Sequence, residues 1–327
     1  MRNVNMQILK PSLVTLPPHI KTLVIINRTI PENADINLIE GVITAESIHE
    51  DRAAVHEAIN GVIQMINDSP RFKIVKASEE LKGSGTGNVF PAPLDWSVVQ
   101  KICDKYNAQA LVAIETFDSD FVVTHEAKED KKVKNDDGTT TTVKQFHAQA
   151  VTTVKTGFRT YDLTNKNIAD QGYFSHNRTW NTKGSTLQEA LIQLIKKSEA
   201  VKTVSYNAGS AYATRITPYY EWVSRSYYKS GNPHLVSGAR KARVNDWQGA
   251  EDAWMKALNS FHKKVKGRAA YNIALTKEIQ GDLQAAKTWA QRAYSEFGNK
   301  KAVKYTSILD WRINQQNILN QQMNSDQ

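Results

Sequence analysis

The sequence predicts a two-domain protein of the α+β/α class. An N-terminal α/β sandwich with a mixed sheet and a long β-hairpin is expected over residues 1–214, and an all-α domain of helical hairpins over residues 215–327. Short aliphatic runs alternate with helical patterns in the first half, as in a layered α/β fold. A Thr- and Val-rich stretch surrounds a turn dipeptide, and a set of small residues recurs 36 positions apart near the C-terminus.

The α/β domain is expected to begin with two strands and an intervening helix. Prolines exclude a helix from residues 4–18, and residues 20–28 contain the aliphatic run of a buried strand. Residues 45–67 place apolar side chains at helical spacing, and a second strand follows at 72–75. Asp95 is a candidate N-cap for a helix that leads to a third strand at 108–117.

A long hairpin is expected over residues 118–162. Asp137-Gly138 is a strong turn signal, and the charged residues before it are typical of a solvated hairpin tip. Residues 168–180 read as a further strand. Helical character then starts near Ser185 and runs toward Ala213, although Gly209 weakens its later part.

Two segments near the C-terminus, 245–258 and 280–294, each combine a polar turn with a helix that carries small or aromatic residues three and four apart. Two helices can cross closely only where small side chains meet, so the sequence predicts tight helix pairs. The predicted packing positions are Trp247, Ala250, Trp254, Ala257, Ala270, Ile273, Ala274, Ala286, Ala290 and Ala293. The pattern resembles the tetratricopeptide repeat. Residues 301–320 are expected to form a capping helix. In the first unit, Gly238 and Lys241 stand where a well-formed first helix would carry Gly and Tyr, so the unit departs from the pattern at Lys241.

The charge distribution singles out the helical domain. The chain carries a net charge of +9, and residues 215–327 hold 18 basic and 9 acidic residues, whereas the rest holds 24 of each. A basic surface favours a partner protein with an acidic surface, an anionic membrane surface or nucleic acid. A solvated helical face explains the charge equally well. Zinc-finger, RNP and basic-zipper signatures are absent from the sequence, so nucleic acid is not the expected partner.

The sequence offers no catalytic, cofactor or metal motif. Cys103 is a single cysteine within an apolar helix pattern, which excludes an internal disulfide framework and a multi-cysteine zinc site. The loop 82–87 is rich in glycine but lacks the lysine that a phosphate loop requires. No run of about 18–20 apolar residues marks a membrane helix. A protein without enzymatic activity and without cofactors is therefore expected.

Aromatic and arginine residues gather where the two predicted domains join. Tyr, Trp and Arg dominate the energetics of protein interfaces, so this group is the candidate partner-binding surface. Packing between the domains is the alternative. The members are Arg215, Tyr219, Tyr220, Trp222, Arg225, Tyr227 and Tyr228.

Two resemblances extend these expectations. Residues 108–114 and 158–166 are similar to the front α/β domains of TolB and the curli-secretion lipoproteins. Residues 25–28, 215–221, 225–228, and 245–247 with Ala250 resemble an uncharacterised family of predicted Bacteroidota lipoproteins. That resemblance implies a mature lipoprotein on the periplasmic side of the cell envelope. Membrane association would then depend only on a lipid anchor whose signal has been removed, because residues 1–7 contain no apolar signal segment.

These observations predict a non-catalytic protein-interaction or scaffold protein of the bacterial cell envelope. The alternative is a glycan- or small-ligand-binding module, or an enzyme, that uses the aromatic cleft at the domain junction.

Overall fold

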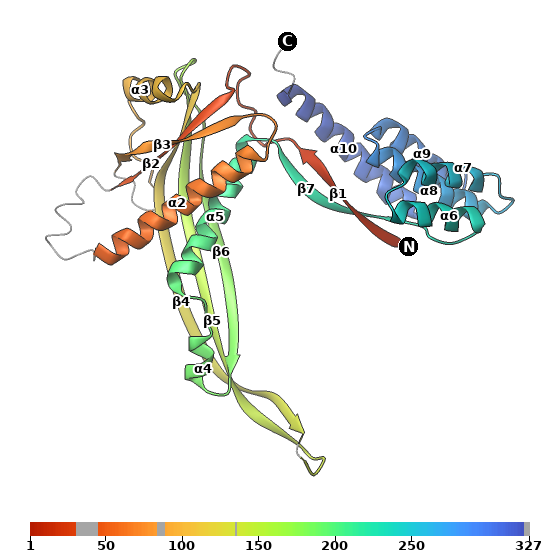
Figure 1. Ribbon diagram of the computed structural model, residues 1–327, viewed down its shortest axis with the longest axis horizontal. Coiled ribbons are helices and arrows are strands. Elements are labelled where there is room, and N and C mark those ends of the chain that lie inside the picture. The colour runs from red at the N-terminus through yellow and green to blue at the C-terminus, as the bar shows by residue number, and fades with distance from the viewer. Residues whose placement is uncertain (31–44, 84–88, 135, 324–327) are drawn as a thin grey trace. The chain divides into compact units, whose positions relative to one another are not determined.

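The computed structural model describes residues 1–30, 45–83, 89–134 and 136–323. The chain forms two units: a sheet unit, Ser12–Pro218, and a helical unit that combines Met1–Pro11 with Tyr219–Gln327 (Figure 1). The predicted class is confirmed, because a mixed-sheet domain is followed by a helical region. The first strand, β1 (Arg2–Lys10), lies in the helical unit, since it pairs antiparallel with β7 (Tyr219–Tyr227) over its whole length.

The sheet unit is built on five strands in the order β3-β2-β4-β5-β6. β2 is parallel to both of its neighbours, whereas β4, β5 and β6 run antiparallel, so the sheet is mixed. The strands are β2 (Thr22–Ile30), β3 (Lys73–Lys82), β4 (Ala110–Lys134), β5 (Thr140–Asp162) and β6 (Asn167–Gly184). β4 does not end near residue 117 as expected but continues as the first arm of the hairpin.

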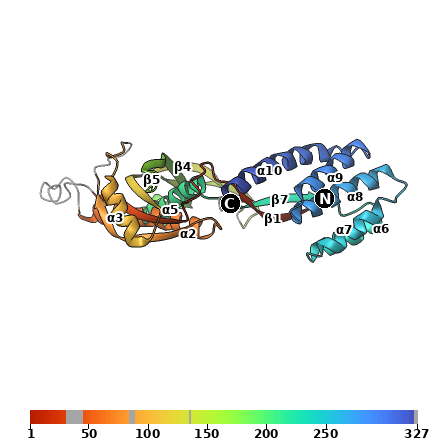
Figure 2. The same cartoon turned by 90° about the horizontal axis from the view of Figure 1, so that it is seen from above.

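Helices cover both faces of this sheet near its parallel strands (Figure 2). α2 (Ala45–Asn67) and α5 (Lys197–Ile216) pack over one core, which includes Ile25 and Val112. α3 (Trp96–Tyr106) packs over the other core, which includes Leu111. The two cores exist because successive side chains of a strand point to opposite faces.

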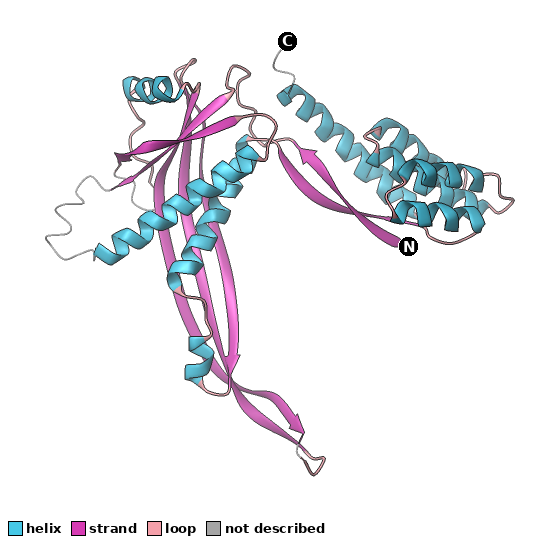
Figure 3. Cartoon of the chain, viewed as in Figure 1, coloured by secondary structure: helices cyan, strands magenta, loops and turns pink. Residues whose placement is uncertain are grey.

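The hairpin of β4 and β5 is longer than the rest of the sheet. β4 and β5 remain paired as far as Lys134 and Thr140, whereas β6 pairs with β5 only as far as Gly184 (Figure 3). The expected single helix after residue 185 is instead two helices, α4 (Leu187–Ile192) and α5. Thr186 caps α4 by accepting a hydrogen bond from the Glu189 amide.

The helical unit contains five helices within the described residues, each packed on the next. Asp246 and Asp282, 36 residues apart, cap α7 and α9 in the same way, and the residues before them, Asn245 and Gly281, both have positive φ. The turn before each of these two helices is thus repeated as well. The five helices of the unit are α6 (Pro233–Arg243), α7 (Trp247–Ala257), α8 (Lys263–Ile279), α9 (Leu283–Ser295) and α10 (Lys301–Met323). Among the described helices none is both long and apolar enough to cross a membrane.

Candidate functional site

The predicted aromatic surface lies mostly on β7 and divides into two faces. Residues opposite one another in an antiparallel pair lie on the same face of the sheet. Trp222 pairs with Gln7 and Tyr220 with Leu9, whereas Tyr227 pairs with Arg2. Alternate residues of the β1–β7 ribbon therefore point outward or toward the helices.

The outward face of the ribbon is uncharged and carries two exposed aromatic side chains. Trp222 is 66% exposed and Tyr220 is 49% exposed. The remaining positions of this outward face are Asn3, Asn5, Gln7, Leu9 and Ser224. Aromatic rings beside amide and hydroxyl groups offer apolar contact area together with adaptable hydrogen bonds, which is the composition of many binding surfaces.

The opposite face anchors the ribbon to the helices. Tyr227 is 2% exposed, and its ring lies 5.9 Å from that of Trp254 and 6.3 Å from that of Trp247. Val4 packs against the same core. Burial raises the pKa of the Tyr227 hydroxyl. Tyr227 is thus a core residue and not part of an exposed surface.

Arg225 belongs to a buried ionic cluster. Its Nη2 and Nε donate to the two oxygens of Glu278 at 2.9 and 3.0 Å. Arg312 Nη1 and the hydroxyl of Tyr305 donate to the same carboxylate, each at 2.6 Å. Glu278 is 2% exposed, so its charge depends on these donors. The cluster joins β7, α8 and α10, and sequence reasoning missed Glu278, Tyr305 and Arg312.

The three remaining candidates are all half-buried. Tyr228 packs on Tyr271, and its hydroxyl donates to the Asn299 side chain at 3.1 Å. Tyr219 is half-buried at the end of β7. Arg215 lies in the sheet unit, where it makes a bidentate pair with Asp170 at 2.9–3.1 Å. Of the seven predicted residues, Tyr220 and Trp222 are exposed, and the other five are buried or half-buried.

The predicted packing residues lie where the helices of the helical unit meet. Trp254 is fully buried, and a Cβ added to Gly238 would lie 2.3 Å from its Nε1. Gly238, which stands where the repeat pattern carries glycine, thus provides the space that Trp254 fills. Trp247 is half-buried. The other predicted positions are buried, namely Ala250, Ala257, Ala270, Ile273, Ala274, Ala286, Ala290 and Ala293.

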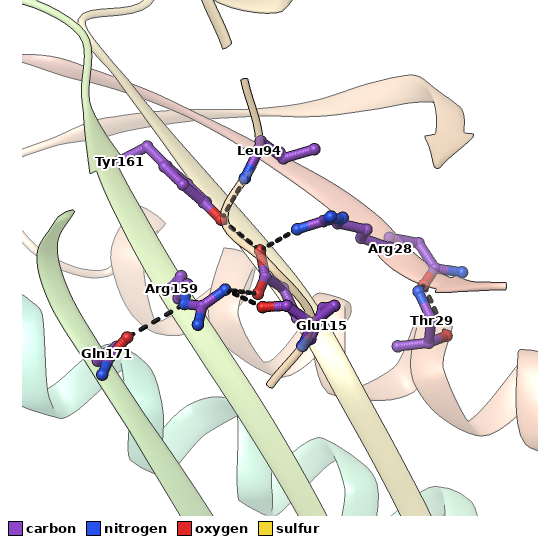
Figure 4. A network of polar contacts seen from close by, with 9 residues as sticks. Arg28, Thr29, Leu94, Glu115, Arg159, Tyr161 and Gln171 are labelled. Atoms are coloured by element: carbon purple, nitrogen blue, oxygen red, sulfur yellow. Dashed lines mark hydrogen bonds and ion pairs between the residues drawn. The ribbon is translucent and has the colours of Figure 1, made fainter. Parts of the chain in front are cut away.

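The sheet unit contains a second buried ionic cluster, which sequence reasoning also missed. The fully buried carboxylate of Glu115 accepts from Arg28 Nη1 at 3.0 Å, Arg159 Nη1 at 2.7 Å and the Tyr161 hydroxyl at 2.6 Å (Figure 4). Arg159 also donates to the Pro91 carbonyl. These contacts tie β2, β4 and β5 together on the face that α3 covers.

A hollow of about 550 Å³ lies beside the irregular pairing of β2 with β3. Glu80 faces it and accepts a hydrogen bond from Asn27 Nδ2 at 3.1 Å, while Arg52 and His56 approach the same carboxylate. Burial lowers the pKa of His56. Three side chains, Asn27, Arg52 and His56, thus engage the Glu80 carboxylate at this hollow.

In the part of the chain that the structure describes, no group of three His, Cys, Asp or Glu side chains is placed to hold a metal ion. Cys103 is buried, and burial raises the pKa of its thiol to about 12. A thiolate nucleophile is therefore not expected at this position. Most of the glycine-rich loop, residues 84–88, lies outside the described residues.

Comparison with known proteins identifies two family models along the chain. A domain of unknown function, DUF8603, matches residues 20–228, and another, DUF6340, matches residues 236–313. An uncharacterised family was expected, and this expectation is confirmed. No curated protein matches the sequence.

Several solved structures match over most of their length. A PelC dodecamer from Paraburkholderia phytofirmans is 12% identical with a TM-score of 0.25, covering 66% of this chain and 99% of its own. A neuraminyllactose-binding hemagglutinin homolog from Helicobacter pylori is 11% identical with a TM-score of 0.28, covering 71% of this chain and 94% of its own.

Proposed function

The chain belongs to the family of the domain of unknown function DUF8603, and from that premise we propose that it is a non-catalytic protein that binds another protein through its helical unit. The observation that carries this proposal is the outward face of the β1–β7 ribbon, where Trp222 and Tyr220 are exposed among uncharged polar residues. Exposed aromatic residues on a rigid element supply binding energy at a low cost in conformational entropy.

The ribbon is held firmly enough to serve as a binding surface. A two-stranded sheet alone is marginally stable in water. Here Tyr227 inserts between tryptophans and Arg225 binds Glu278, so alternate residues of β7 are fixed to the helices. The surface is therefore preformed, which reduces the entropy lost when a partner binds.

We propose that α6 to α9 are two tetratricopeptide-like units and that α10 caps them. The 36-residue spacing of the Asp246 and Asp282 caps and the buried alanines at matching positions support this assignment. The excess of basic residues after residue 215 favours a partner with an acidic surface. This is a scaffold function, because the helices contribute packing and charge rather than reactive groups.

We test the proposal with a pull-down by the full chain. The variant Tyr220→Ala/Trp222→Ala should lose proteins that the wild type retains, because each substitution removes an exposed ring. Tyr294→Ala is the matched control, since Tyr294 is 50% exposed on α9 and Tyr220 is 49% exposed. Equal retention by the wild type, the control and the double variant would contradict the proposal.

A glycan-binding role is the second candidate, and the outward face favours it too, because aromatic rings beside amides and hydroxyls also suit neutral sugars. A glycan screen read by tryptophan fluorescence distinguishes the two roles. A signal that Tyr220→Ala abolishes would support glycan binding over protein binding, because this variant retains Trp222 as the reporter.

We also propose that the protein works on the periplasmic side of the bacterial cell envelope, as the resemblance to predicted Bacteroidota lipoproteins implies. Fractionation of the native host tests this location. Recovery with the cytoplasmic proteins would contradict it.

A further inference from the structure

A basic hollow of about 430 Å³ lies at one end of the helical unit, where α8 begins and α9 is joined to α10. Tyr228, Phe297 and Asn299 form part of its wall. Five cationic side chains line it: Lys263, Lys264, Arg268, Lys300 and Lys301. No acidic side chain lines the hollow among the described residues.

The positive charge around this hollow is largely uncompensated. Segment 256–268 contains five basic residues and no acidic residue. Segment 294–304 contains three basic residues and Glu296, which is already paired with Arg292 at 2.8 Å. Within the described part of the chain, Lys263, Lys264 and Lys300 have no ion-pair partner. The site therefore attracts anionic groups.

Arg268 is oriented toward this end by two contacts. Its Nη1 donates to the Ser230 carbonyl at 2.8 Å, and its guanidinium lies 5.3 Å from the centre of the Tyr228 ring. The Tyr228 hydroxyl in turn bonds to Asn299. The hollow thus has a fixed wall. Lys301 Nζ donates to Met1 Sδ at 3.1 Å, whereas the other three lysines of the lining have no ion-pair partner among the described residues.

A fully exposed phenylalanine stands beside the cations. Phe261 is 103% exposed and lies in the loop between α7 and α8, two residues before Lys263. Consecutive Cα atoms are 3.8 Å apart, so Phe261 lies within about 8 Å of the start of α8. A single exposed apolar side chain is common on protein surfaces, but next to a cationic cluster it is available to enter the apolar boundary of a lipid surface.

The chemistry of this end distinguishes a lipid surface from a protein. Seven of the eight basic residues in segments 256–268 and 294–304 are lysines. Lysine is depleted in protein interfaces, where arginine, tyrosine and tryptophan are enriched. Clusters of lysine close to an inserted aromatic residue are instead characteristic of proteins that bind anionic membranes.

We propose that this end of the helical unit binds an anionic lipid surface. The cationic hollow receives headgroup phosphates, and Phe261 enters the boundary between headgroups and acyl chains. This contact is separate from the ribbon that we propose for protein binding, and it does not require a lipid anchor on the chain.

Vesicle co-sedimentation of the full chain tests the proposal. The chain should sediment with phosphatidylcholine vesicles that contain 30% phosphatidylglycerol and remain in solution with pure phosphatidylcholine. Binding should weaken as salt is raised, because screening reduces attraction to the surface. Failure to bind the anionic vesicles, or equal binding to both kinds, would overturn the proposal.

Two variants locate the contact. Lys263→Ala/Lys264→Ala should weaken binding roughly 25-fold, because each cation contributes about a 5-fold effect near an anionic surface. Phe261→Ser should weaken it by about 10-fold. Arg240→Ala/Arg243→Ala is the matched control, which removes two exposed charges in the last turn of α6 and should leave binding unchanged. Equal effects of both double variants would refute a localised site.

A competition experiment distinguishes binding to lipid from binding to other anions. Neither 10 mM inorganic phosphate nor double-stranded DNA should release the chain from vesicles at moderate salt. Release by phosphate would identify a small-molecule phosphate site, and release by DNA a nucleic-acid site; either result would overturn the lipid proposal. The pull-down with Tyr220→Ala/Trp222→Ala is independent of all these outcomes.

Discussion

The crossing of α2 and α5 gives a prediction in which two physical effects have opposite signs. Gly209 lies inside α5, and replacing a mid-helix glycine with alanine usually stabilises a helix by about 1 kcal/mol. A Cβ at Gly209, however, would lie 1.8 Å from the carbonyl oxygen and 2.7 Å from the carbonyl carbon of Ala58 in α2. These are backbone atoms, so no side-chain rotation relieves the overlap.

The steric effect should outweigh the helix propensity. An ordinary contact requires about 3.4 Å, so α2 and α5 would have to separate by roughly 1.5 Å. Overpacking of a tight core costs about 1–3 kcal/mol, and a clash with fixed backbone belongs at or above the upper end of that range. We therefore expect Gly209→Ala to destabilise the sheet unit by about 2 kcal/mol net, which lowers its unfolding temperature by roughly 4–8 °C.

Hydrogen exchange of α5 peptides, together with thermal unfolding, measures this effect in the sheet unit separately from the helical unit. Asn207→Ala is the control, because Asn207 is exposed on the same helix and gains helix propensity without a clash. The control should be neutral or slightly stabilising. If Gly209→Ala matched the control, the close backbone crossing of α2 and α5 would be refuted.

Three further predictions concern buried polar groups. Glu278→Gln should destabilise the helical unit by about 3–5 kcal/mol in denaturant unfolding, because it leaves Arg225 and Arg312 buried without a counter-charge. The control is Glu296→Gln, which breaks the exposed pair with Arg292, and an equally small loss of stability in both variants would contradict the prediction. Cys103, whose pKa burial raises to about 12, should react with a thiol reagent at pH 8 only after the sheet unit unfolds, and rapid native-state reaction would contradict its burial. Burial, followed by the nearby Glu278 charge, raises the pKa of Tyr305 well above its usual value. The contribution of the Tyr305 hydroxyl to stability is therefore complete below about pH 10 and is lost above it. Between pH 9 and 11 the unfolding temperature of Tyr305→Phe should fall less than that of the wild type, and parallel pH curves for the two proteins would contradict this prediction.

Local signals in the sequence predicted the helical hairpins well. Asp246 and Asp282 are caps whose effect depends on the next three residues, and the buried alanines recur on one helix face. The pairing of β1 with β7 was not predicted, because it joins residues more than 200 positions apart and neither strand carries a local signal for its partner. Hydrophobic pattern alone cannot choose such a partner.

The two ionic clusters were missed for a related reason. Glu115 lies among aliphatic residues of β4, and its strand position alone places it in the α3-side core. A buried carboxylate within an apolar strand requires cationic partners, so the sequence did contain a signal that Glu115 is special. It gave no means of choosing Arg28 and Arg159 from the other basic residues of the chain.

The aromatic group on β7 shows how the period of a strand changes a functional interpretation. When only the residue types are considered, the aromatic and arginine residues from Tyr219 to Tyr228 form one cluster. In an extended strand, however, alternate residues point to opposite faces. Tyr227 and Arg225 therefore hold the ribbon to the helices, while Tyr220 and Trp222 face outward. The buried half makes the exposed half useful, because a surface fixed by its own reverse side can bind a partner without first having to become ordered.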